Sequence, residues 1–88
     1  MRSLDELEVA MFRAAVETRE DLGLALQQAR LAAGLSQRDV AVRIGASQRY
    51  VWELESGRDF TAIERLLAML GATGAQLVVE VPEGDVDG

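Results

Sequence analysis

The sequence predicts an all-α fold of five short helices followed by one C-terminal β-strand. A hydroxyl residue followed three positions later by an acid, the pattern of a helix-capping box, occurs before four stretches of helical apolar periodicity. Glycines, which favour helix C-termini, stand where several of these stretches end. The four pairs are Ser3 and Glu6, Thr18 and Asp21, Ser36 and Asp39, and Thr61 and Glu64.

These signals place the five helices in order along the chain. The first is expected over residues 4–17, with apolar residues at helical spacing. The second ends at Gly34, the third runs from Gln37 to Gly45, and the fourth runs from about Ser47 to Gly57. The fifth begins near Thr61 and fades through Gly71 and Gly74.

One β-strand is expected near the C-terminus, where β-branched residues alternate over 76–81 and Pro82 stops the pattern. A lone strand leaves its backbone groups unpaired, and no other segment is expected to complete a sheet. We therefore expect it to pair antiparallel with a second copy of the chain across a two-fold axis. An edge strand lying over the helices and a frayed tail are the alternatives. The residues of this dimer strand are Leu77, Val78, Val79 and Val81.

Composition excludes several classes of function. With 88 residues the chain has room for one domain, and without cysteine it forms no disulfide and no thiolate metal site. The absence of histidine removes the commonest metal ligand and general base. There is no lysine and no glycine-rich phosphate loop, so we expect neither an enzyme nor a bound cofactor or metal. The acidic start of the chain and the lack of a long apolar run predict a cytoplasmic protein.

The net charge of −6 is distributed unevenly. Residues 1–24 hold three Arg and six acids, residues 25–58 five Arg and three acids, and residues 59–88 one Arg and six acids, giving −3, +2 and −5. A local basic face can neutralise phosphates on an acidic body, because screening weakens distant charges. A solvated charged surface explains the same pattern, so charge alone does not decide the function.

The segment from Ser36 to Gly57 carries the functional signal. It predicts two short helices joined by a tight turn at Gly45, where a glycine suits positive φ. Ala41 is small where the helices cross, and Val51 and Leu54 are spaced to pack the second helix onto the first. This is the helix-turn-helix pattern, in which the second helix presents its N-terminal side chains to the DNA major groove.

The chain resembles a known family over roughly residues 21–71. The pattern is Ser36-Gln37-x-Asp39-Val40-Ala41-x-x-x-Gly45-Ala46-Ser47-x-x-x-Val51-x-x-Leu54-Glu55-x-Gly57, and it resembles the phage-repressor (Xre-type) helix-turn-helix. The start Asp21-Leu22-Gly23 and the C-terminal strand are similar to those of HipB-type antitoxins. That resemblance implies a dimer with paired C-terminal strands and a HipA-like kinase toxin as partner. The expected organisation is a helical extension (1–18), a helix-turn-helix DNA-binding domain (19–74), a dimerisation strand (75–82) and a disordered acidic tail (83–88).

The resemblance also implies roles for individual residues. The recognition helix opens with four residues expected to contact bases, of which Gln48 can pair with adenine and Arg49 with guanine through two hydrogen bonds each. Four residues are expected at phosphates, and among them Gln37 also braces the base readers. The base-contacting set is Ser47, Gln48, Arg49 and Tyr50, and the phosphate-contacting set is Gln37, Arg38, Arg43 and Arg58.

Two further positions concern structure. Arg30 and Glu55 match positions that form a partly buried ion pair in related repressors, so we expect them to tie the second helix to the recognition helix. Trp52 departs from the family pattern, in which a small polar residue is usual. A contact with the DNA backbone, a contact with a protein partner and packing on the core remain open for it.

The expected function is that of a dimeric, cytoplasmic and nucleoid-associated repressor that reads a palindromic operator in double-stranded DNA with two recognition helices. An antitoxin that autoregulates its own operon is favoured. A phage-type or metabolic repressor without a toxin is the nearest alternative. A protein-interaction adaptor on the same fold is a third, favoured by the overall acidity and by Trp52.

Overall fold

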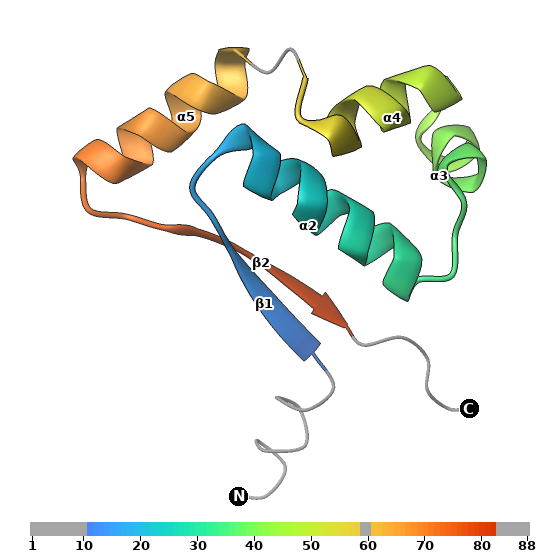
Figure 1. The fold of residues 1–88 in the computed structure, drawn as a ribbon, viewed down its shortest axis with the longest axis horizontal. Helices are drawn as coiled ribbons and strands as arrows, with labels where there is room; N and C mark the ends of the chain where they lie inside the picture. Colours follow the sequence, from blue (N-terminus) through green and yellow to red (C-terminus); the bar gives the residue numbers. More distant parts are fainter. Residues whose placement is uncertain (1–10, 59–60, 83–88) are drawn as a thin grey trace, which may run out of the picture.

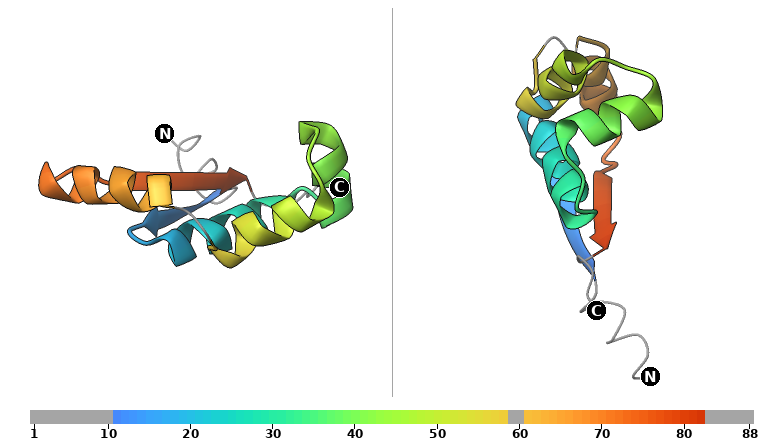
Figure 2. Two further views of the ribbon diagram at one scale, coloured as in Figure 1. Left: turned by 90° about the horizontal axis from the view of Figure 1, so that it is seen from above. Right: turned by 90° about the vertical axis from the view of Figure 1, so that its right-hand side faces the viewer.

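A computed structural model describes residues 11–58 and 61–82 of the chain. The elements, in order, are β1 (Met11–Val16), α2 (Arg19–Ala32), α3 (Gln37–Ile44), α4 (Gln48–Ser56), α5 (Thr61–Ala72) and β2 (Leu77–Pro82). The two strands form one antiparallel sheet beside α2, while α3 and α4 lie at one end of the molecule and α5 at the other (Figures 1 and 2). The helix-turn-helix unit is therefore α3 and α4, supported by α2.

Local side-chain caps start the helices. The Thr18 hydroxyl accepts a hydrogen bond from the Asp21 amide at 3.0 Å, and the Asp21 carboxylate accepts one from the Thr18 amide at 3.2 Å. Ser36 and Asp39 repeat this arrangement at 3.0 and 2.9 Å. These two predicted capping boxes are confirmed. Each satisfies backbone amides that the first helical turn leaves without partners.

The turn between α3 and α4 depends on glycine. Gly45 ends α3 with φ 72°, and Gly57 ends α4 with φ 74°, both in the left-handed region that side chains with a Cβ rarely adopt. The Ala46 amide donates to the Ala41 carbonyl at 2.9 Å, which closes the turn. Both helix ends lie where the sequence predicted them.

The prediction of five helices with one lone strand is wrong. Residues 11–16, expected in a helix over 4–17, form β1, and the described residues contain four helices and two strands. β1 pairs with β2 in antiparallel register from Met11 opposite Pro82 to Val16 opposite Leu77. The remainder of the expected helix (4–10), its Ser3–Glu6 cap and the acidic tail (83–88) lie outside the described residues.

The pairing gives the physical reason for the error. The strand Leu77–Pro82 does need a partner for its backbone groups, as predicted, but the partner is β1 of the same chain. Side chains along β1 alternate between exposed Arg13 and Ala15 and the more buried Ala14 and Val16, as a half-buried strand requires. β1 is thus the partner that the sequence did not reveal, and pairing of Leu77, Val78, Val79 and Val81 with a second copy stays a prediction.

The core is built from small side chains. The buried apolar residues of the described chain are Val16, Ala25, Ala41, Val51 and Val81. Gly23 lies where α2 crosses α4, and a Cβ on it would stand 2.3 Å from the Glu55 carbonyl oxygen. The two helices thus meet backbone to backbone, which fixes α4 on α2. No helix among the described residues is both long and apolar enough to cross a bilayer.

Candidate nucleic-acid interface

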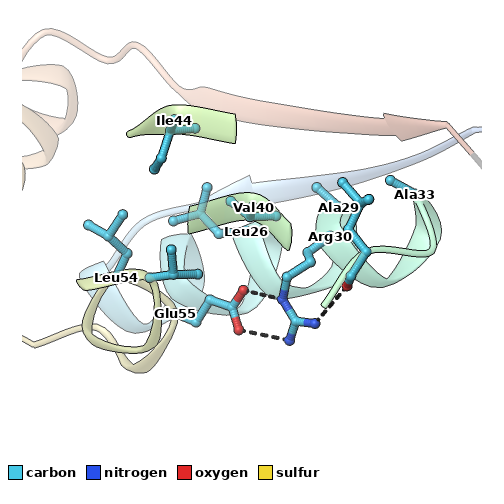
Figure 3. A pocket seen from close by; sticks show the side chains of 10 residues that line it. Leu26, Ala29, Arg30, Ala33, Val40, Ile44, Leu54 and Glu55 are labelled. Carbon is cyan, nitrogen blue, oxygen red and sulfur yellow. Dashed lines mark hydrogen bonds and ion pairs between the residues drawn. The ribbon is translucent and has the colours of Figure 1, made fainter. Parts of the chain in front are cut away.

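An ion pair in the interior of the helical unit holds the recognition helix α4 on α2. The Arg30 guanidinium donates to both Glu55 carboxylate oxygens, from Nε at 2.5 Å and from Nη2 at 3.0 Å (Figure 3). The side chains are only 12% and 7% exposed, respectively. Arg30 Nη1 also donates to the Leu35 carbonyl at 3.0 Å, so the loop between α2 and α3 is fixed to the same group.

Gln37 extends this network to α3. Its side-chain Nε2 donates to Glu55 Oε1 at 3.1 Å. Burial raises the pKa of the Glu55 carboxyl, but hydrogen bonds from Arg30 and Gln37 outweigh it, so the net pKa lies below the ordinary value. The hydrogen bond to Glu55 raises the pKa of Arg30. The ion pair is therefore charged at neutral pH and joins the three helices α2, α3 and α4.

The start of α4 presents polar side chains to solvent. The Ser47 hydroxyl accepts a hydrogen bond from the Tyr50 amide at 3.0 Å and caps the helix, so one of its lone pairs already serves the first turn. Gln48, Arg49 and Tyr50 follow on the first turn and are exposed. Val51 turns inward and is buried. The predicted base-contacting residues thus occupy the exposed start of the helix.

Two arginines are held near this surface by neighbouring side chains. Arg49 Nε lies 3.3 Å from Glu53 one turn further along α4, and its side chain is largely exposed. The Arg58 guanidinium carbon lies 4.9 Å from the centroid of the exposed Trp52 ring, a cation–π contact. The sequence alone leaves the role of Trp52 open. Its departure from the family pattern, together with the arginine just after the helix, could have pointed to this contact.

A hollow on the surface collects these groups. Its lining brings together Gln37 from α3, Gln48, Arg49 and Trp52 from α4, and Arg58 beyond the helix end. Two guanidinium groups and two carboxamides supply hydrogen-bond donors at one place, beside an indole ring. Such a set can bind phosphate oxygens and the edges of bases.

The other predicted contact residues lie outside the hollow. Arg38 and Arg43 are exposed on α3, on either side of Asp39, and Ser47 and Tyr50 do not line the hollow. The Ser36 amide and hydroxyl lower the pKa of the Asp39 carboxyl. Among the residues that the structure describes, no group of three or more acidic side chains is placed to hold a metal ion.

Comparison with known proteins identifies the domain. A family model described as a helix-turn-helix domain matches residues 21–78, which is more than half of the chain and includes all the residues that line the hollow. The match is consistent with the Xre-type resemblance. No curated protein and no solved structure matches the chain significantly. The chain therefore belongs to the helix-turn-helix domain family, which indicates a DNA-binding regulator.

Proposed function

We propose that this protein is a sequence-specific transcriptional repressor that uses α4 as its recognition helix. The hollow formed by Gln37, Gln48, Arg49, Trp52 and Arg58 carries the proposal, because it sets base-reading and phosphate-binding side chains side by side. Recognition helices of this motif contact base edges with their N-terminal residues, and those residues of α4 are polar and exposed.

The roles divide between bases and phosphates. Gln48 and Arg49 read bases, with Ser47 and Tyr50 beside them, and the Arg49 Nη nitrogens have no partner among the described residues. The positioning contacts to phosphates come from Gln37, Arg38, Arg43 and Arg58. Trp52 supports this division by holding the Arg58 guanidinium beside the hollow.

The operator is palindromic and the protein binds it as a homodimer. A single α4 covers a few base pairs, and helix-turn-helix dimers read two half-sites about one DNA turn, roughly 34 Å, apart. We place the dimer surface elsewhere than on β2, since pairing with β1 already gives that strand one partner.

More specifically, we propose that the protein is a cytoplasmic antitoxin that represses its own operon and binds a HipA-like kinase toxin. The support is the resemblance of Asp21-Leu22-Gly23 to the start of HipB-type antitoxins. The intrachain pairing of β2 weakens the second point of that resemblance. Stable co-purification with the product of an adjacent kinase-like gene tests this role. Repression without any such partner would identify a phage-type or metabolic repressor instead.

DNA binding is tested by fluorescence anisotropy with the protein's own upstream DNA and a random duplex, across a salt series. The double variant Gln48→Ala/Arg49→Ala should lose most of the preference for the specific DNA, since each good bidentate contact contributes about 1–3 kcal/mol of discrimination. Arg58→Ala should weaken binding to both duplexes. It should also reduce, by about 1, the slope of the logarithm of the binding constant against the logarithm of the salt concentration. Arg65→Ala, an exposed arginine on α5, is the matched control and should leave both unchanged.

Two results would contradict the proposal. One is a wild-type protein that binds its upstream DNA no better than random duplex at low salt, which would favour a protein-interaction adaptor on this fold. The other is a Gln48→Ala/Arg49→Ala variant that keeps the wild-type preference, which would remove α4 from the reading of sequence.

A further inference from the structure

An apolar groove lies open between α2, α3 and α4. Leu26, Val40, Ile44 and Leu54 line it from the three helices, and Figure 3 shows their side chains around the same space. Among the described residues that line it, the charged ones are Arg30 and Glu55, which neutralise each other. The groove therefore accepts a neutral, apolar occupant.

The apolar side chains that α2, α3 and α4 direct into the groove are not covered by any other part of the described chain. Ile44 is 55% exposed, and of the apolar groove residues Val51 alone is buried in the described structure. Burial of exposed apolar area of this kind is favourable, because it removes that area from water. A contiguous apolar surface on a small protein is typical of an interaction site.

Helix α5 has an apolar face but lacks a packing partner. It carries apolar residues at helical spacing, yet none of its residues is buried. Leu66 is 46% exposed, and Met69 is more exposed still. The remaining members of its apolar stripe are Ile63, Leu67 and Leu70, each half-buried. The described chain thus contains both an unfilled groove and an unpacked amphipathic helix.

In the described structure α5 lies away from the groove of its own chain. Near the start of α5, Glu64 lies 3.3 Å from Arg19 at the start of α2. Beyond its end, the chain enters β2, where Leu77 is opposite Val16 of β1. Figures 1 and 2 show α5 at the end of the molecule opposite α3, which forms one wall of the groove.

We propose that the α5 helix of a second copy fills this groove, and that the exchange is reciprocal. Two copies related by a two-fold axis would bury both grooves and the apolar stripes of both α5 helices. The groove is neutral and the α5 stripe is apolar, so the two surfaces match in charge and polarity. This inference names the surfaces of the proposed homodimer and rests on that part of the proposed function.

Substitutions in the groove test the assembly. Analytical ultracentrifugation without DNA should show a dimer for the wild type. Ile44→Glu should raise the dimer dissociation constant at least tenfold. Val42→Glu, on the same helix, 75% exposed and outside the groove, is the matched control and should dimerise as the wild type does. Circular dichroism checks that both variants stay folded. Equal dimerisation of the two variants would overturn the proposal.

Site-specific cross-linking identifies the occupant. The chain has no cysteine, so introduced thiols are the only ones. An Ile44→Cys chain and a tagged Leu66→Cys chain are mixed, exchanged and treated with a short bis-maleimide. The proposal predicts a product that joins one chain of each kind. A chain that carries both Ile44→Cys and Leu66→Cys is treated in the same way as a control. A product of Leu66→Cys with itself alone, an internal link at monomer mass in that double variant, or no product would each overturn the proposal.

DNA binding is measured separately on the same samples. A cross-linked exchanged dimer that shows no DNA preference would refute the proposed function and leave the exchange intact. A dimer that binds its operator but gives no link between residues 44 and 66 would refute the exchange alone.

Discussion

The helical unit of α2, α3 and α4 and the sheet of β1 and β2 are held together by different kinds of contact. The helical unit has a part-buried polar centre, where Arg30, Glu55 and Gln37 each come from a different helix. The sheet relies on backbone pairing and on buried Val16 and Val81, with its ion pair between Arg13 and Glu80 left exposed. An ion pair thus joins the helices in the first region, whereas the ion pair of the second region lies on the surface.

The largest expected loss of stability comes from a substitution in the polar centre. Glu55→Gln leaves the part-buried Arg30 charge without its anionic partner, so the free energy of unfolding should fall by about 3–5 kcal/mol. Urea denaturation followed by circular dichroism measures it. The control is Glu53→Gln on the same helix, which removes the exposed Arg49–Glu53 pair at a cost of at most about 0.5 kcal/mol. Equal losses in the two variants would show that burial of the pair is unimportant.

The next effect concerns the helix crossing beside that centre. In Gly23→Ala the new methyl group meets the backbone of Glu55, and we expect a loss of about 1–3 kcal/mol in unfolding free energy. Gly71→Ala, within α5 and with nothing near its Cβ position, should instead gain up to about 1 kcal/mol. Thermal denaturation of both variants measures the difference. If Gly23→Ala were as stable as the wild type, α2 and α4 would not be in close contact.

A third variant probes the sheet. Val81 is 1% exposed, and Val81→Ala removes two buried methyl groups, so the unfolding free energy should drop by about 2 kcal/mol. Arg13→Ala, which breaks only the exposed ion pair of the sheet, should cost less than about 1 kcal/mol. If Arg13→Ala proved the more harmful in a chemical denaturation series, the contrast between the two regions would be reversed.

The smallest effect is a pH dependence. The pKa of Glu55 is lower in the folded protein than its ordinary value of 4.5, so the ionised carboxylate favours the folded state above that pH. This contribution is lost as the pH falls from 4.5 through the folded pKa. Asp21 and Asp39 have lowered pKa values as well and act in the same direction. The decline in unfolding free energy below pH 4.5 should therefore be shallower, but not absent, in Glu55→Gln.

The starts of α2, α3 and α4 could be predicted from the sequence because their determinants are local. A cap is a contact between a side chain and a backbone amide three residues away, and Thr18, Ser36 and Ser47 all make it. The ends at Gly45 and Gly57 are equally local, since each needs only one residue with positive φ. The Arg30–Glu55 contact spans 25 residues, and only the family resemblance suggested it.

The sheet and the position of α5 could not be predicted in this way. Residues 11–16 include alanines and a methionine that fit a helical period, and their strand conformation comes from pairing with residues 77–82. The apolar stripe of α5 predicts a helix but not its packing partner. Of the candidate site, Gln37, Gln48, Arg49 and Arg58 were named in advance, whereas the place of Trp52 beside Arg58 emerged from the structure. Their contacts with DNA remain predictions.

The pairing of residue 11 with residue 82 also sets the order in which the domain can fold during synthesis. The caps and turns of α2, α3 and α4 join residues that leave the ribosome close together, so these helices can assemble early. β1 leaves the ribosome before them, yet its partner strand emerges only after α5. Until then its backbone edge stays open to other strands. The nascent chain is therefore most vulnerable to mispairing at β1, until β2 emerges and pairs with one of its edges.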